Sequence, residues 1–379
     1  MNCWMTRAPV GGAARRRRGS AAPALLFWVF AVALFVVPFL SAPDAPDWGG
    51  ATDPRRVENW ADPSTPFNPE DPVFWEAVEE AEAQLGDALE VSLAAYIKEQ
   101  SELWFGATSD KLRDRKVIEV SRLAAGRKTY NAECAGCHGG DLASDVVPGD
   151  GAGPAARYMD PRPRNFRKGF YKFTTTDSGQ RPLRKDLYRT ISYGLTGASM
   201  PHFKLLTEER RHDVVEYVRY LSLRGEFEEL LLSFTVDDGE LADPEEVAEL
   251  VNEWWDEKNL AAIFPSSAEP EMTPETIANG RQLYMDSEGA GCAGCHGETG
   301  IGDGPSAEEF LDSWGYPIKP RDFTDGVYRA GDTNTDLWVT IATGINGTPM
   351  GSFSSSLTSE EIWHIVHFVR SLERKEADQ

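Results

Sequence analysis

The sequence predicts an all-α protein that contains two similar helical units in tandem. The pentapeptide C-A-G-C-H occurs at Cys134–His138 and again at Cys292–His296, 158 residues later. Near both copies, apolar residues recur at three- and four-residue steps, which is the spacing of one helix face. The predicted segments are a signal or membrane anchor at 1–45, a proline-rich spacer with a helical segment at 46–115, a first unit at 116–224, an acidic helical bridge at 225–272 and a second unit at 273–379.

Each pentapeptide has the C-x-x-C-H spacing by which c-type haem is attached to a protein. Two thiols one helical turn apart can add to the two vinyl groups of one porphyrin, and the next histidine supplies the proximal nitrogen to the iron. Zinc is the alternative, but six histidines and five cysteines leave few further ligands. We therefore expect two covalently bound haem c groups, held by Cys134, Cys137 and His138 and by Cys292, Cys295 and His296.

The N-terminal segment combines a basic cluster with an apolar run. Four arginines at 15–18 precede an uncharged stretch from Ala21 to Leu40, and 20 apolar residues can cross a bilayer core. The basic cluster predicts a cytoplasmic start with the remainder of the chain outside. A cleaved signal peptide is the alternative, although Leu40-Ser41-Ala42 is an imperfect cleavage site. The sequence favours an uncleaved anchor, and a twin-arginine signal is a weaker interpretation.

A helical stripe follows the proline-rich spacer. Pro72 opens it, and apolar or small residues at three- and four-residue steps extend from Phe74 to Ala95, with glutamates between them. Such a stripe usually packs on another part of the protein. We expect it to lie on the first unit or on a partner helix.

The second unit repeats the first in the same order over about 210 residues. In both units a leading helix precedes the pentapeptide, and a closing helix starts at a capping residue, Thr207 or Thr358. Four short motifs recur: Gly126-Arg127 as Gly280-Arg281, Gly151–Pro154 as Gly302–Pro305, Pro163–Phe166 as Pro320–Phe323, and Ser199-Met200 as Pro349-Met350.

Charge is distributed unevenly over a chain with formal net charge −23. The first unit has 19 Lys and Arg against 12 Asp and Glu, the bridge has 1 against 15, and the second unit has 7 against 17. The bridge also carries Trp254 and Trp255, which predict an ordered segment rather than a free linker. Nucleic acid is excluded as a partner because its backbone requires a basic footprint. An acidic second unit is instead expected to face a basic partner surface.

Each unit resembles a class I cytochrome c domain: a leading helix, C-x-x-C-H, a proline after the haem loop, a late methionine and a terminal helix. The pair behind an apolar N-terminal segment is similar to membrane-anchored dihaem cytochrome c subunits of bacterial respiratory complexes, such as that of cbb3-type oxidases. The resemblance does not cover 46–115 and 225–272.

The sixth iron ligands are predicted to be Met200 and Met350. After His296 the second unit has no methionine except Met350, whereas Met159 and His202 compete with Met200 in the first unit. His364 and His367 lie within the closing helix and are expected to be solvated. Thioether ligation would raise the reduction potential of each haem.

The resemblance implies further roles around each haem. Pro154 and Pro305 resemble the family proline whose carbonyl accepts a hydrogen bond from the proximal histidine. Arg164 and Arg321 could neutralise haem propionates, although surface ion pairs are an alternative. Aromatic side chains are expected to pack in the haem pockets, namely Tyr171, Phe173 and Tyr328.

The predicted function is electron transfer between respiratory redox partners by a periplasm-facing, membrane-anchored dihaem cytochrome without bond chemistry of its own. The alternative is a dihaem enzyme, either a peroxidase or an oxidase of small sulfur or nitrogen compounds, with one open iron. Such an enzyme would use Met159 or His202 in place of Met200. A haem-based sensor would need a signalling domain, and the sequence shows none.

Overall fold

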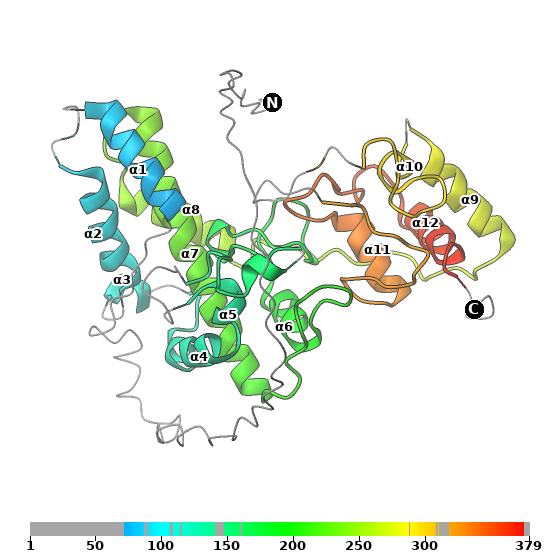
Figure 1. The fold of residues 1–379 in the computed structure, drawn as a ribbon, viewed down its shortest axis with the longest axis horizontal. Helices are drawn as coiled ribbons and strands as arrows, with labels where there is room; N and C mark the ends of the chain where they lie inside the picture. The colour runs from blue at the N-terminus through cyan, green and yellow to red at the C-terminus, as the bar shows by residue number, and fades with distance from the viewer. Residues whose placement is uncertain are drawn as a thin grey trace, which may run out of the picture. The chain divides into compact units, whose positions relative to one another are not determined.

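The computed structural model describes residues 72–374, except for 87–88, 90, 107–108, 114–115, 141–147, 160, 288, 308–309 and 311–317. Its regular structure in these ranges is helical, as the sequence predicts (Figure 1). The predicted anchor and proline-rich spacer lie outside the described residues. Among the helices that are described, none has the length and apolar character needed to cross a membrane.

The first unit is organised around the crossing of two helices. Helix α4 (Val120–Glu133) packs on α7 (Glu208–Asp238), and Gly126 lies at their closest approach. A β-carbon added at Gly126 would overlap the carbonyl oxygen of Asp213. Thr207 caps α7, because its side chain accepts a hydrogen bond from Arg210 N. Between these helices the chain forms α5 (Ala135–His138), η3 (Ala156–Tyr158), η4 (Phe166–Lys168) and α6 (Arg184–Tyr193).

Helix α7 is much longer than a closing helix of the first unit requires. The predicted boundary at Arg224 falls inside it, and its 31 residues continue to Asp238. The apolar face of the helix does not stop at the boundary, because Phe227 and Leu231 are as fully buried as Leu221. Part of the acidic bridge therefore belongs to the same core as the first haem motif.

Three helices pack on the second half of α7, and a fourth, short helix packs on one of them (Figure 1). Phe74 and Val78 are buried as the stripe predicts, but the stripe breaks at Gly86, whose φ is +56°, and Ser92 caps a new helix. Ala95, predicted to be part of the stripe, is exposed. Trp255 is fully buried. The four helices are α1 (Pro72–Leu85), α2 (Leu93–Phe105), α3 (Asp110–Arg113) and α8 (Pro244–Trp255).

The second unit repeats the crossing with a separate core. Helix α9 (Pro274–Met285) packs on α12 (Ser359–Ser371), with Gly280 at the contact. Thr358 and Glu361 form the predicted capping box at the start of α12. The remaining helices of this unit are α10 (Ala293–His296) and α11 (Asn334–Thr343).

Gly280→Ala is expected to destabilise the second unit, because the added β-carbon would overlap the carbonyl oxygen of His364. Forcing extra volume into a packed contact costs about 1–3 kcal/mol, so the free energy of unfolding in urea should fall by at least that amount. Gly294→Ala is the matched control, since no atom lies within 4 Å of a β-carbon added there. Equal stability of the two variants would contradict the packing argument.

Candidate functional site

The two C-x-x-C-H motifs form the same short helix in both units. The backbone N–H of His138 donates to the carbonyl of Cys134 at 2.9 Å, and that of His296 donates to Cys292 at 2.8 Å. One helical turn therefore separates the first thiol from the imidazole in α5 and in α10. This is the spacing that attachment of one porphyrin requires.

Both histidine rings are fixed by a carbonyl that was not predicted. Nδ1 of His138 donates to the carbonyl oxygen of Arg164 at 3.0 Å, and Nδ1 of His296 donates to that of Arg321 at 3.3 Å. This bond leaves Nε2 of each ring with its lone pair free for a metal. Phe166 stacks on His138 at 4.4 Å between ring centroids, and Phe323 stacks on His296 at 4.5 Å.

The expectation that the Pro154 and Pro305 carbonyls accept these bonds is wrong. Each proline is exposed in a turn that folds back on the motif helix, where Gly153 N donates to Cys137 O and Gly304 N donates to Cys295 O, both at 3.1 Å. The preceding glycine permits this approach, because a β-carbon on Gly153 would lie 2.6 Å from Ala135 O. The prolines thus shape the turn, and the chain reaches the histidines only at the following arginines.

The two predicted methionine ligands occupy loops of the same conformation. Helix α6 ends at Gly194 and α11 at Gly344, with φ of +69° and +72°. In each loop a backbone N–H closes the turn onto the methionine carbonyl, from Leu195 to Met200 at 3.1 Å and from Ile345 to Met350 at 2.9 Å. The two methionines therefore occupy equivalent backbone positions in turns that the same hydrogen bond closes.

The competitors of Met200 lie in different settings. Met200 is partly buried and packs against the first core, whereas His202 is exposed. Met159 follows the short helix η3. Ligation by Met200 remains a prediction.

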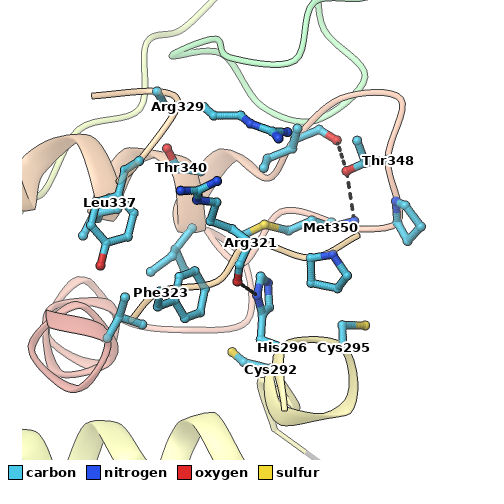
Figure 2. Close-up of a pocket in the computed structure, with 18 of the residues that line it drawn as sticks. Cys292, Cys295, His296, Arg321, Phe323, Arg329, Leu337, Thr340, Thr348 and Met350 are labelled. Atoms are coloured by element: carbon cyan, nitrogen blue, oxygen red, sulfur yellow. Dashed lines mark hydrogen bonds between the residues drawn. The ribbon is translucent and has the colours of Figure 1, made fainter. Parts of the chain in front are cut away.

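The second unit has a cavity of about 500 Å³ that is lined by all four residues predicted to hold its haem. Cys292, Cys295, His296 and Met350 all line it, and Figure 2 shows the Met350 thioether in the same pocket as the His296 imidazole. Thr348 fixes the loop, because its hydroxyl donates to Ile345 O at 2.7 Å and accepts from Met350 N at 3.3 Å (Figure 2). A thiol pair, an imidazole and a thioether in one apolar cavity fit a covalently attached haem.

Burial sets the charge of these groups. Before haem attachment, burial raises the pKa of the Cys134 thiol to about 12 and that of the Cys292 thiol to about 11. Burial also lowers the pKa of His138 to about 4 and lowers the pKa of His296. Both imidazoles are therefore neutral at pH 7, the form that binds a metal.

The remaining predicted site residues lie near the two histidines or line the cavity of the second unit. Tyr171 stacks on Phe166 at 5.7 Å and Tyr328 on Phe323 at 6.3 Å. Phe173, expected in a haem pocket, lines that of the second unit. The Arg321 guanidinium donates to Val327 O at 2.7 Å and pairs with Asp325, so a propionate role for Arg164 and Arg321 remains a prediction.

One expectation about the histidines of α12 is wrong. His367 is fully buried, and its Nδ1 lies 2.9 Å from the Thr276 hydroxyl of α9. The close crossing at Gly280 brings these helices together and removes His367 from solvent. His364 is partly buried beside Glu360.

Comparison with known families covers both motifs. Residues 121–218 match the family described as cytochrome c oxidase, cbb3-type, subunit III, and residues 277–373 match the family described as cytochrome c. Each match contains one C-x-x-C-H motif. The chain belongs to the cytochrome c family. It is a dihaem cytochrome c with two covalent haem c groups, attached through Cys134 and Cys137 and through Cys292 and Cys295. Cytochromes of the c type are extracytoplasmic.

The dihaem cytochrome is also similar to a solved structure from Kuenenia stuttgartiensis. That chain belongs to the reducing HAO-like protein complex Kustc0457/Kustc0458. The two are 36% identical with a TM-score of 0.52, and the match covers 66% of this chain and 96% of that chain. No curated protein matches the sequence.

Two residues with a role at the site were missed from the sequence, namely the ring-stacking Phe166 and Phe323. Their signal was present, because both close the repeated P-R-N-F and P-R-D-F motifs. Because this motif recurs after the haem loop of both units, its phenylalanine could have been predicted to contact the proximal histidine.

Proposed function

We propose that the dihaem cytochrome carries electrons between redox proteins, with both irons ligated by histidine and methionine. The observation that supports this best is the repetition of one ligand frame: a neutral histidine fixed by a carbonyl, and a methionine in a closed turn, in both units. The bound haems supply the electron-accepting groups. The chain holds each imidazole in orientation through Arg164 or Arg321, excludes water with apolar walls and offers a thioether to each iron.

The experiment is an absorption spectrum of the exported protein, oxidised and reduced, with and without carbon monoxide. Two His/Met haems should give the weak sulfur-to-iron band of the oxidised form at an intensity counting two irons, and neither reduced haem should bind the gas readily. A haem that lacks the band and binds carbon monoxide would instead indicate an enzyme with one open iron.

We further propose that the cytochrome acts as a subunit beside a larger redox protein on the periplasmic side of the membrane, where its acidic second unit faces a basic surface. The similar Kuenenia stuttgartiensis chain is part of a protein complex, which supports this arrangement. Native electrophoresis of a gentle cell extract with haem staining should show a species larger than the single chain. A haem band at single-chain size alone would contradict it.

A further inference from the structure

The methionine loop of each unit contacts an arginine of the other unit. A β-carbon added at Gly347 would lie 3.2 Å from Nη1 of Arg164. One added at Gly197 would lie 3.0 Å from Cγ1 of Val327 and 3.6 Å from Nη1 of Arg321. Each glycine stands three residues before the predicted methionine ligand of its unit, and the two arginines are equivalent in the repeated motif. An arginine of one unit therefore lies beside the methionine loop of the other in both directions, and the approach is closer at Gly347.

Each arginine thus reaches two haem sites. Its backbone carbonyl accepts the hydrogen bond from the histidine of its own unit. Its guanidinium lies against the methionine loop of the opposite unit. A single residue therefore lies between the proximal ligand of one haem and the predicted distal ligand of the other.

The glycines fit this arrangement by conformation as well as by size. Gly197 and Gly347 have φ of +68° and +70°, which side chains rarely adopt. Each lies within a turn that is closed by the hydrogen bond to the methionine carbonyl. A displacement of the guanidinium would therefore act on a closed turn that ends at the methionine.

Other contacts also join the two units. Asn346, next to Gly347, accepts a hydrogen bond from Gly179 N at 2.7 Å. Arg189 of the first unit pairs with Asp336 of the second at 2.6 Å. In addition, Lys172 of the first unit lines the cavity of the second haem site. The contact at Gly347 thus belongs to a bonded interface.

We propose that Arg164 and Arg321 are positioning residues, each of which sets the conformation of the methionine loop in the opposite unit, so that the two haem sites are coupled across the interface. This inference rests on the proposed His/Met ligation. It makes the environment of one iron depend on a side chain of the other unit. The rate of electron transfer between the two haems would then depend on the conformation of both methionine loops.

The test is the NMR spectrum of the reduced holoprotein with ¹³C-methyl methionine, because the porphyrin ring current displaces the signal of a bound methionine methyl group. Met200→Ala and Met350→Ala assign the two signals. Arg164→Ala is expected to shift the Met350 signal of the opposite unit, while its backbone carbonyl still accepts from His138. Arg189→Ala is the control and should shift that signal less, because it removes the ion pair to Asp336 in the first turn of α11, at the opposite end of that helix from the Met350 loop. The proposal is overturned if Arg164→Ala leaves the Met350 signal in place or shifts it no more than Arg189→Ala does.

A double-mutant cycle isolates the contact itself. Gly347→Ala places a methyl group against the Arg164 guanidinium, so its effect on the Met350 signal should be smaller when Arg164 is already alanine. The backbone strain at Gly347 is the same in both backgrounds and cancels. Additive effects would mean that the two residues do not act on each other.

Reduction potentials give a readout that does not depend on the methionine signals. Arg164→Ala should shift the reduction potentials of both haems relative to the wild type. If Arg164 acted only within the first unit, only the potential of the first haem would shift. Arg164→Lys keeps the charge but loses the planar group, and serves if the alanine variant folds poorly. Absence of both methionine signals in the wild type would contradict the ligation, while the potentials still decide the coupling.

Discussion

Met350→Ala is expected to convert the second haem into one that binds carbon monoxide while the first haem keeps its ligands. Met350 is placed in the cavity with Cys292, Cys295 and His296 by a turn closed at Ile345. Loss of the thioether should remove about half of the sulfur-to-iron band and lower the potential of that haem on the order of 0.1 V, within the roughly 0.8 V range that axial ligands cover. Absorption spectra and a redox titration measure both changes.

The matched variants are in the first unit. Met200→Ala should make the first haem bind carbon monoxide in the same way. Met159→Ala should leave both irons with their methionine ligands, because Met159 follows η3 and lies outside the turn that Leu195 N closes onto Met200 O. Loss of the band in Met159→Ala would transfer the ligand role to Met159 and revive the enzyme interpretation. An unchanged spectrum in Met350→Ala would exclude Met350 as a ligand.

The sequence was sufficient for the features that depend on local spacing. The two C-x-x-C-H turns and the caps at Thr207 and Thr358 all involve neighbours within a few residues. Their physical causes act over one or two helical turns and leave a pattern in the chain. Duplication made the pattern visible, because two copies of a glycine or a proline mark one structural requirement.

Features that depend on packing between distant segments were missed. Pro154 and Arg164 both follow the first haem motif, and only the folded loop determines which carbonyl meets His138. The length of α7 was hidden for another reason. Glu226 and Glu228 made the segment after Arg224 read as a separate acidic bridge, whereas both carboxylates are buried against arginines that are distant in sequence or one turn away.

That buried network predicts the largest stability effect in the first unit. Glu228 pairs with Arg167 of η4 and, at 2.8 Å, with Arg224, and all three side chains are at most 3% exposed. Arg224 also reaches Glu102 of α2 at 3.3 Å. Glu228→Gln would leave two buried guanidinium groups with one fewer charge partner, and breaking a buried pair typically costs about 3–5 kcal/mol.

Chemical unfolding of the holoprotein measures this loss. The control is Glu245→Gln, because the pair of Glu245 with Lys111 is exposed and should contribute less than about 1 kcal/mol. Similar stability of the two variants would show that the buried carboxylate is replaceable by an amide. Because the network joins η4, α7 and α2, its loss should also expose the core that holds Phe166 against His138.

The same carboxylate makes the effect depend on pH. Burial alone would raise the pKa of Glu228, but the charges of Arg167 and Arg224 outweigh it and hold the pKa below its usual value. A carboxyl group whose pKa is lower in the folded state stabilises the protein above the pKa of the unfolded chain, and this contribution is lost as the pH falls through the folded pKa. The stability difference between wild type and Glu228→Gln should therefore be constant near pH 7 and shrink below about pH 4, near the ordinary pKa of glutamate. A difference that stays the same down to acid unfolding would mean that Glu228 contributes through packing and hydrogen bonding rather than through its charge.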